Sequence, residues 1–172
     1  MARRPSIHDE EVVGLAARNL VAKAVRENEG LEGREHDLIV GVSHAIQYND
    51  DGYDICRSLE SDGWEPDAKL VEIMDQAIFE KMDALRMAEA VWAAKEKIVM
   101  RFGVREAVSF ADRTGAWQRG VILSVDERRA KYTVFCEALG HVPQGQNGVS
   151  GIILNEEDCS PAEDTRCLQN PR

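Results

Sequence analysis

The chain has 172 residues, enough for one domain or two small ones. It is 44% hydrophobic and 30% charged, which is typical of a globular protein with a packed core. Its longest apolar stretches fall far short of the roughly 18 residues that a membrane span needs. The formal net charge of −10 disfavours nonspecific binding to phosphate-rich partners such as nucleic acids.

The N-terminal segment predicts a cytoplasmic protein. Met1–Pro5 is basic, but the polar run Ser6–Glu11 follows where a signal peptide would need apolar residues. The four cysteines include no Cys-x-x-Cys pair, and in the cytoplasm we expect them to be reduced. Cys159 and Cys167 lie in a polar C-terminal segment, where we expect both thiols to be exposed.

Apolar residues at helical spacing predict four helices before the strand-forming part of the chain begins. The segment Ser6–Asp9 has the pattern of a capping box, with a hydroxyl followed three residues later by a carboxylate, and so predicts the first helix start. Glycines and an Asn-Asp-Asp-Gly run separate the next elements. The expected helices cover about residues 7–28, 35–48, 53–61 and 67–101.

The fourth predicted helix is unusually long, since no Gly or Pro occurs from Ala68 to Arg101. About 34 helical residues span roughly 50 Å, more than the first helix can cover. An uncovered apolar stripe of that length predicts an interface. We therefore expect a homodimer, or a tight complex with a protein partner, through Leu85–Val99, with Leu85 and Trp92 among the contact residues.

Short strand-forming runs separated by turn residues follow from residue 106 onward. Asp112–Gly115 has Asp and Gly where a tight turn requires them. Gly120, inside the second run, is typical of a bend or of close backbone approach. The expected strands contain Ala107–Phe110, Trp117–Val125, Tyr132–Phe135 and Gly151–Leu154.

This pattern resembles the SH3-like barrels of the Tudor and agenet type. The matching residues are Val108 and Phe110, then Gly115 with Trp117 and Gly120-Val121, then Tyr132 and Val134. The resemblance implies a small β-barrel that binds a partner. Some members hold a methylated side chain in a cage of aromatic rings. The aromatic candidates here are Trp117, Tyr132 and Phe135, but Tyr132 and Phe135 differ by three positions and so face opposite sides of one strand.

The sequence thus predicts an α+β chain: a helical domain (1–104), an SH3-like β-barrel (105–158) and a flexible tail (159–172). One alternative for the aromatic residues places Phe110 and Phe135 in the barrel core with Trp117 half-buried. The other exposes Trp117 on a contact surface built from Arg113, Trp117, Arg119 and Tyr132. Trp and Arg are the residue types that most often dominate binding surfaces.

The sequence contains no recognisable motif of a catalytic, cofactor-binding or metal site. The four histidines are scattered, no His-Glu-x-x-His or zinc-type spacing occurs, and no Gly-rich loop precedes a helix. Asn49–Gly52 has part of a calcium-loop pattern, but Gln47 and Ser58 then stand where Asp and Glu are required. We therefore expect no catalytic, cofactor-binding or metal site.

These expectations favour a non-enzymatic protein-binding, adaptor or regulatory protein. A narrower form is an inhibitor from a phage or mobile element that blocks a host nucleic-acid-binding machine, as anti-CRISPR and DNA-mimic proteins do; only size and acidity motivate it. The alternative is a nucleic-acid-associated factor using the basic turns of the barrel. Those turns carry Arg113, Arg119, Arg128, Arg129 and Lys131.

Overall fold

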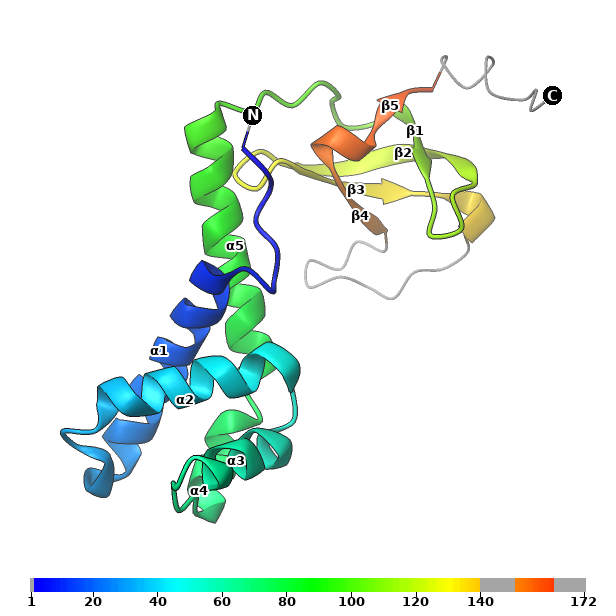
Figure 1. Ribbon diagram of the computed structural model, residues 1–172. Helices are drawn as coiled ribbons and strands as arrows, with labels where there is room; N and C mark the ends of the chain where they lie inside the picture. Colours follow the sequence, from blue (N-terminus) through cyan, green and yellow to red (C-terminus); the bar gives the residue numbers. More distant parts are fainter. Residues whose placement is uncertain (1, 140–150, 163–172) are drawn as a thin grey trace. The chain divides into compact units, whose positions relative to one another are not determined.

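The computed structural model describes residues 2–139 and 151–162, and the chain forms two compact units (Figure 1). Met1–Val91 is helical, and Trp92–Arg172 contains a five-stranded antiparallel sheet. This confirms the predicted α+β class. The division falls earlier than the predicted boundary at residue 104, because Trp92 and Ala93 pack with Ala130 of the second unit. No helix in the described ranges combines the length and apolarity needed to cross a membrane.

Side chains from all five helices form the core of the helical unit. Helix α1 and the start of α5 lie side by side, joined by Lys23, whose ammonium donates to the side-chain oxygens of Gln76 at 2.8 Å and Glu80 at 2.6 Å. Asp51 and Asp67 cap α3 and α4, accepting hydrogen bonds from backbone N–H groups of the first turns. The helices are α1 (Glu10–Glu27), α2 (Glu35–Tyr48), α3 (Gly52–Ser61), α4 (Ala68–Met74) and α5 (Ala77–Glu96).

The prediction of one continuous helix over 67–101 is wrong, because the chain breaks between α4 and α5 at Asp75 and Gln76. The Asp75 carboxylate accepts a 2.9 Å hydrogen bond from the backbone N–H of Gly52 at the start of α3. The Gln76 N–H bonds to the carbonyl of Ile73, a tighter turn than that of an α-helix. A contact with a distant segment thus ends α4 where no Gly or Pro marks the end.

Helix α5 ends at Glu96 in a Schellman motif. Lys97 adopts the left-handed conformation at φ 54°, and the Ile98 N–H bonds back to the carbonyl of Ala93 at 3.1 Å. The N–H of Lys97 bonds to the carbonyl of Ala94. The predicted end at residue 101 is therefore too late, because Lys97 takes the conformation that usually requires Gly.

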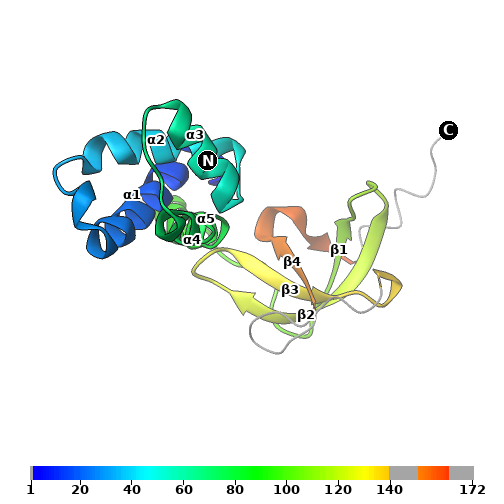
Figure 2. The ribbon, with the colours of Figure 1, turned by 90° about the horizontal axis from the view of Figure 1, so that it is seen from below.

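The sheet has the strand order β4-β3-β2-β1-β5 and is open, so closure into a barrel is not observed (Figure 2). Its inner face is a separate hydrophobic core that includes Val108, Phe110, Ile122, Tyr132 and Val134. The strands are β1 (Ala107–Ala111), β2 (Trp117–Asp126), β3 (Lys131–Phe135), β4 (Ile152–Asn155) and β5 (Ser160–Pro161).

The prediction of a flexible tail from residue 159 is wrong for its first residues. Cys159 is buried, and burial raises the pKa of its thiol to about 12. Ser160 and Pro161 form β5 against β1. The Arg101 guanidinium holds this segment in place. It pairs with the Glu156 carboxylate and donates hydrogen bonds to the backbone carbonyls of Glu156 and Cys159 at 2.8 Å each. The expected exposure of Cys167 concerns a position outside the described residues.

Candidate functional site

The turn between β1 and β2 is held by the carboxylate of Asp112. Its oxygens accept hydrogen bonds from the N–H and hydroxyl of Thr114, the N–H of Ala116 and the side-chain amide of Gln118, at 2.6–3.0 Å. These hydrogen bonds, led by the Thr114 hydroxyl, lower the pKa of Asp112 to about 2. Gly115 sits at φ 82°, as the turn pattern predicted. The turn therefore presents Arg113 and the start of β2 in a defined geometry.

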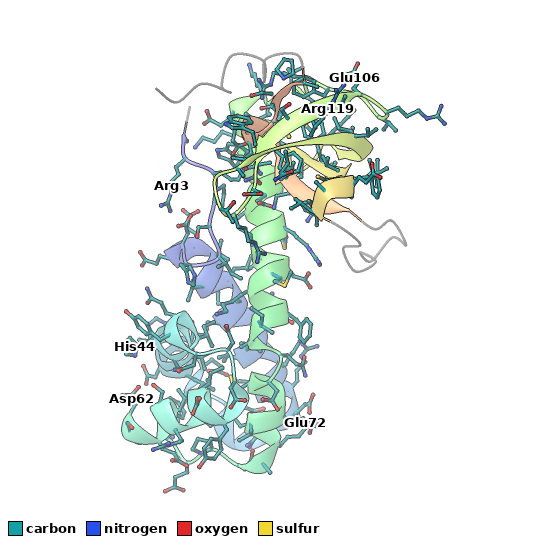
Figure 3. All side chains as sticks on the ribbon, turned by 90° about the vertical axis from the view of Figure 1, so that its right-hand side faces the viewer. Arg3, His44, Asp62, Glu72, Glu106 and Arg119 are labelled. Carbon is teal, nitrogen blue, oxygen red and sulfur yellow. The ribbon has the colours of Figure 1, made fainter. Side chains whose placement is uncertain are left out.

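Alternation along β2 divides its side chains between two faces. Trp117, Arg119 and Val121 are exposed, and the Trp117 side chain is 45% accessible. Gly120 and Ile122 are buried on the core side. The exposure of Trp117 and Arg119 agrees with the contact surface expected from the sequence. Arg119 is labelled on the sheet in Figure 3.

Two further apolar side chains extend this exposed surface across the sheet. Phe135 on β3 pairs with Val121 and is 45% exposed. Ile153 on β4 pairs with Thr133 and is 64% exposed. We call the five side chains Trp117, Arg119, Val121, Phe135 and Ile153 the outer face. Phe135 is thus not a core residue, so the alternative that placed Phe110 and Phe135 in the core is wrong for Phe135 and right for Phe110.

A shallow depression of about 560 Å³ lies in the outer face. Its apolar side chains are those of Val121, Phe135 and Ala138, and Arg119 and Glu137 place one positive and one negative charge at it. Gly120 lets β2 pack closely on β3, because a Cβ there would lie 2.3 Å from a methyl carbon of Val134. The lining residues are Arg119, Gly120, Val121, Phe135, Glu137 and Ala138.

Tyr132 does not belong to this surface, so its expected role as a contact residue is wrong. Its ring is buried in the core of the sheet unit, and its phenolic oxygen accepts a 3.0 Å hydrogen bond from the Phe102 N–H. Desolvation raises the pKa of the phenol. Strand alternation puts Tyr132 inside and Phe135 outside, so an aromatic cage containing both rings does not form.

Leu85 and Trp92, the predicted contact residues of the long helix, also lie on covered surfaces. Leu85 packs against the core of the helical unit. Trp92 is 8% exposed and packs with Ala93 and Ala130 in the second unit. The two positions differ by seven residues and so share one side of α5. That side packs inward, and the apolar residues of α5 that remain exposed lie elsewhere on the helix.

The basic residues of the turns differ in exposure and in pairing. The Arg129 guanidinium pairs with the carboxylate of Asp126 at 2.6 Å, while Arg113 and Arg128 are exposed. The charges also divide unevenly between the units. Residues 1–91 contain ten Lys and Arg against twenty Asp and Glu, whereas residues 92–172 contain eleven of each. The helical unit therefore carries the whole net charge, and the sheet unit is neutral.

Chemical groups for a metal site do not gather in the described ranges, 2–139 and 151–162, where no three His, Cys, Asp or Glu side chains come close enough to hold an ion. The sequence analysis missed Val121 and Ile153 as surface residues, and it left Phe135 open between an aromatic cage and the core. Period-two alternation along β2 could have grouped Val121 with Trp117, whereas Phe135 and Ile153 join them only through the pairing of β3 and β4. No protein-family model, curated protein or solved structure matches the chain.

Proposed function

We propose that this chain is a non-enzymatic protein-binding protein, acting as an adaptor or regulator through the outer face of its sheet. The observation that carries the proposal is the exposure of Trp117, Val121, Phe135 and Ile153 on one side of the neighbouring strands β2, β3 and β4. Exposed apolar side chains that are contiguous and rimmed by charge are typical of interaction sites. Aromatic residues and Arg contribute most to binding at such surfaces.

The chemistry of the depression favours a peptide segment as the bound group. An apolar side chain of the partner fits against Val121 and Phe135, and a neighbouring carboxylate pairs with Arg119. Glu137 accepts a hydrogen bond from a backbone or side-chain donor of the same segment. The Asp112 turn holds Trp117 ready for contact, which lowers the entropy lost on binding.

The SH3-like barrel belongs to the same proposal. Its support is the strand order, in which β4 and β5 form the two edges of the sheet. Only the η3 turn (Glu156–Asp158) and Cys159 connect these strands. Five residue steps from Asn155 to Ser160 span at most about 18 Å, so the two edges curl toward each other. A curled sheet with a bound partner on its face is the arrangement that the resemblance implies.

The acidity of the helical unit supports a narrower form, in which the partner carries a basic surface. Nucleic-acid-binding proteins have such surfaces, and a chain that occupies one competes with the nucleic acid. The inhibitor of a nucleic-acid-binding machine, expected above from size and charge, is a protein of this kind. The neutral sheet unit gives the nucleic-acid-associated alternative less support.

A random peptide display library tests the proposal directly. Peptides selected on the wild-type chain should contain an apolar residue next to Asp or Glu, and should lose binding to Trp117→Ala and Phe135→Ser. Tyr53→Ala is the matched control, because Tyr53 is an exposed aromatic on α3. Binding that survives both sheet substitutions would contradict the proposal. Binding of an unstructured oligonucleotide that weakens with salt would instead favour the nucleic-acid alternative.

A further inference from the structure

Strand β4 forms one edge of the sheet, because among the described residues it pairs with β3 alone (Figure 1). In an antiparallel ladder, successive residues turn their backbone groups to opposite sides of the strand. The Glu156 N–H bonds to the carbonyl of Ala130 at 3.0 Å, on the β3 side. In steps of two, Leu154 and Ile152 also turn their backbone groups toward β3. The N–H and C=O of Ile153 therefore point outward from the edge.

The two edges of the sheet differ in how easily a further strand can join them. Strand β5 is only two residues long, and one of them is Pro161, which has no N–H to donate. Strand β4 contains neither Pro nor Lys, the residues that often protect an edge. Ile153 is 64% exposed, so the described chain leaves this part of β4 largely uncovered. An exposed apolar edge without such protection is a template for pairing with another chain.

The outer face begins at this edge and continues across β3 to β2. Ile153 pairs with Thr133, and continuing the register places Gly151 beside Phe135. Gly151 has no side chain, and a Cβ there would lie 2.6 Å from the methyl carbon of Thr133. No side chain of β4 therefore stands between the edge and the exposed ring of Phe135. The depression lined by Phe135 and Val121 lies beyond that ring.

We propose that β4 binds an extended segment of the protein partner, which joins the sheet as a further strand. This inference rests on the proposed function, since the outer face supplies the side-chain contacts. The N–H and C=O of Ile153 pair with the backbone of the segment, which provides affinity. Alternate side chains of the segment point to the outer face. One lies beside Ile153, and another, two residues along, lies over Gly151 and reaches Phe135.

The segment that fits this edge carries large apolar residues at alternate positions. Neighbouring strands lie about 4.8 Å apart, so about 10 Å separates the added backbone from that of β3. A Leu, Phe or Tyr side chain and the Phe135 ring together fill that distance. A helical segment does not fit, because its backbone groups already bond to one another. The partner is therefore recognised through an extended segment with apolar residues two positions apart.

N-methylation of a peptide backbone tests strand addition on the full wild-type chain. The probe is a peptide selected from the display library and N-methylated at one residue at a time. A methyl group on an N–H that faces β4 removes a hydrogen bond and blocks close approach, so it should weaken binding about tenfold or more. A methyl group on the next N–H points to solvent and should have little effect. Titration calorimetry should thus show losses at every second position.

A proline at position 153 tests the same edge from the side of the protein. Ile153→Pro removes the outward N–H, whereas the matched control Ile153→Ala loses the side chain and keeps the N–H. The proline variant should bind the unmodified peptide about tenfold more weakly than the alanine variant. Thermal melts check that both variants fold. If the proline variant unfolds, the N-methyl series on the wild-type chain decides the question.

Two results would overturn strand addition: losses that do not alternate along the peptide, or equal binding by two folded Ile153 variants. The proposed function would survive either result if binding still required Trp117 and Phe135. A library that yields no binding peptide would overturn both proposals.

Discussion

The backbone N–H of Gly52 donates a 2.9 Å hydrogen bond to the carboxylate of Asp75 across 23 residues of sequence. The same contact leaves no room for a side chain at position 52. A Cβ there would lie 2.5 Å from both the Asp75 carboxylate and the Val71 carbonyl. The start of α3 and the end of α4 are therefore packed backbone to backbone.

Gly52→Ala should destabilise the helical unit by about 3 kcal/mol, the upper end for overpacking, because the carbonyl of Val71 cannot move without distorting α4. Urea unfolding followed by circular dichroism measures the change. Gly14→Ala on α1 is the matched control. The nearest atom to its Cβ is 3.8 Å away, so the substitution should stabilise the helix by about 0.5–1 kcal/mol. Equal effects at both positions would contradict the packing argument.

Lys97→Gly should stabilise the chain by about 1 kcal/mol. Lys97 holds the left-handed C-terminal position of α5, where a side chain is strained and Gly is not. Lys95→Gly, two residues earlier inside α5, should have the opposite sign and cost about 0.5–1 kcal/mol. Paired thermal melts test the two signs, and a destabilised Lys97→Gly variant would show that its side chain has a stabilising contact.

Trp117→Ala should weaken binding of a selected peptide by about 2 kcal/mol, the scale of an interface hot spot, and leave the thermal midpoint nearly unchanged. Titration calorimetry and a thermal melt measure the two quantities. Trp92→Ala should behave in the opposite way. Its ring is buried, so the substitution should cost about 3 kcal/mol or more in stability. A large fall in the midpoint for Trp117→Ala would instead assign that ring a structural role.

Acid should loosen the β1–β2 turn through Asp112. The pKa of this carboxyl is about 2 in the folded chain, below its ordinary value of 3.8. Its ionised form is thus favoured by folding, so the stabilisation is fully present above about pH 4 and is lost as the pH falls through about 2. The difference in unfolding free energy between wild type and Asp112→Asn should shrink over that interval. A carboxyl resonance titrating near 4 in NMR spectra would disprove the shift.

Periodicity in the sequence predicted the existence and type of most elements, since α2 has the expected bounds at 35–48 and the strands lie where alternation placed them. It also separated Tyr132 from Phe135. It could not say which of these two rings faces inward, because alternation distinguishes two faces without identifying the covered one. The sequence pattern could not predict the helix break at Asp75 for a different reason. Its cause is a hydrogen bond to a segment distant in sequence.

The same limit applies to the candidate site. The exposure of Trp117 and Arg119 followed from their position after a Gly turn, which local chemistry determines. Leu85 and Trp92 were chosen as contact residues because they share one side of a helix. Which side of that helix packs inward depends on α1 and on the sheet unit's own core, and neither is encoded in the local pattern.

The hydrogen bonds of Arg101 determine where a folded fragment containing the sheet can begin. A fragment begun at residue 105, where the strand pattern starts, lacks the guanidinium and leaves the carbonyls of Glu156 and Cys159 without their donor. It also lacks Phe102, whose N–H bonds to Tyr132. A fragment begun at residue 92 retains both contacts. Expressed alone, the longer piece should give dispersed amide resonances and the shorter piece should aggregate or stay unfolded.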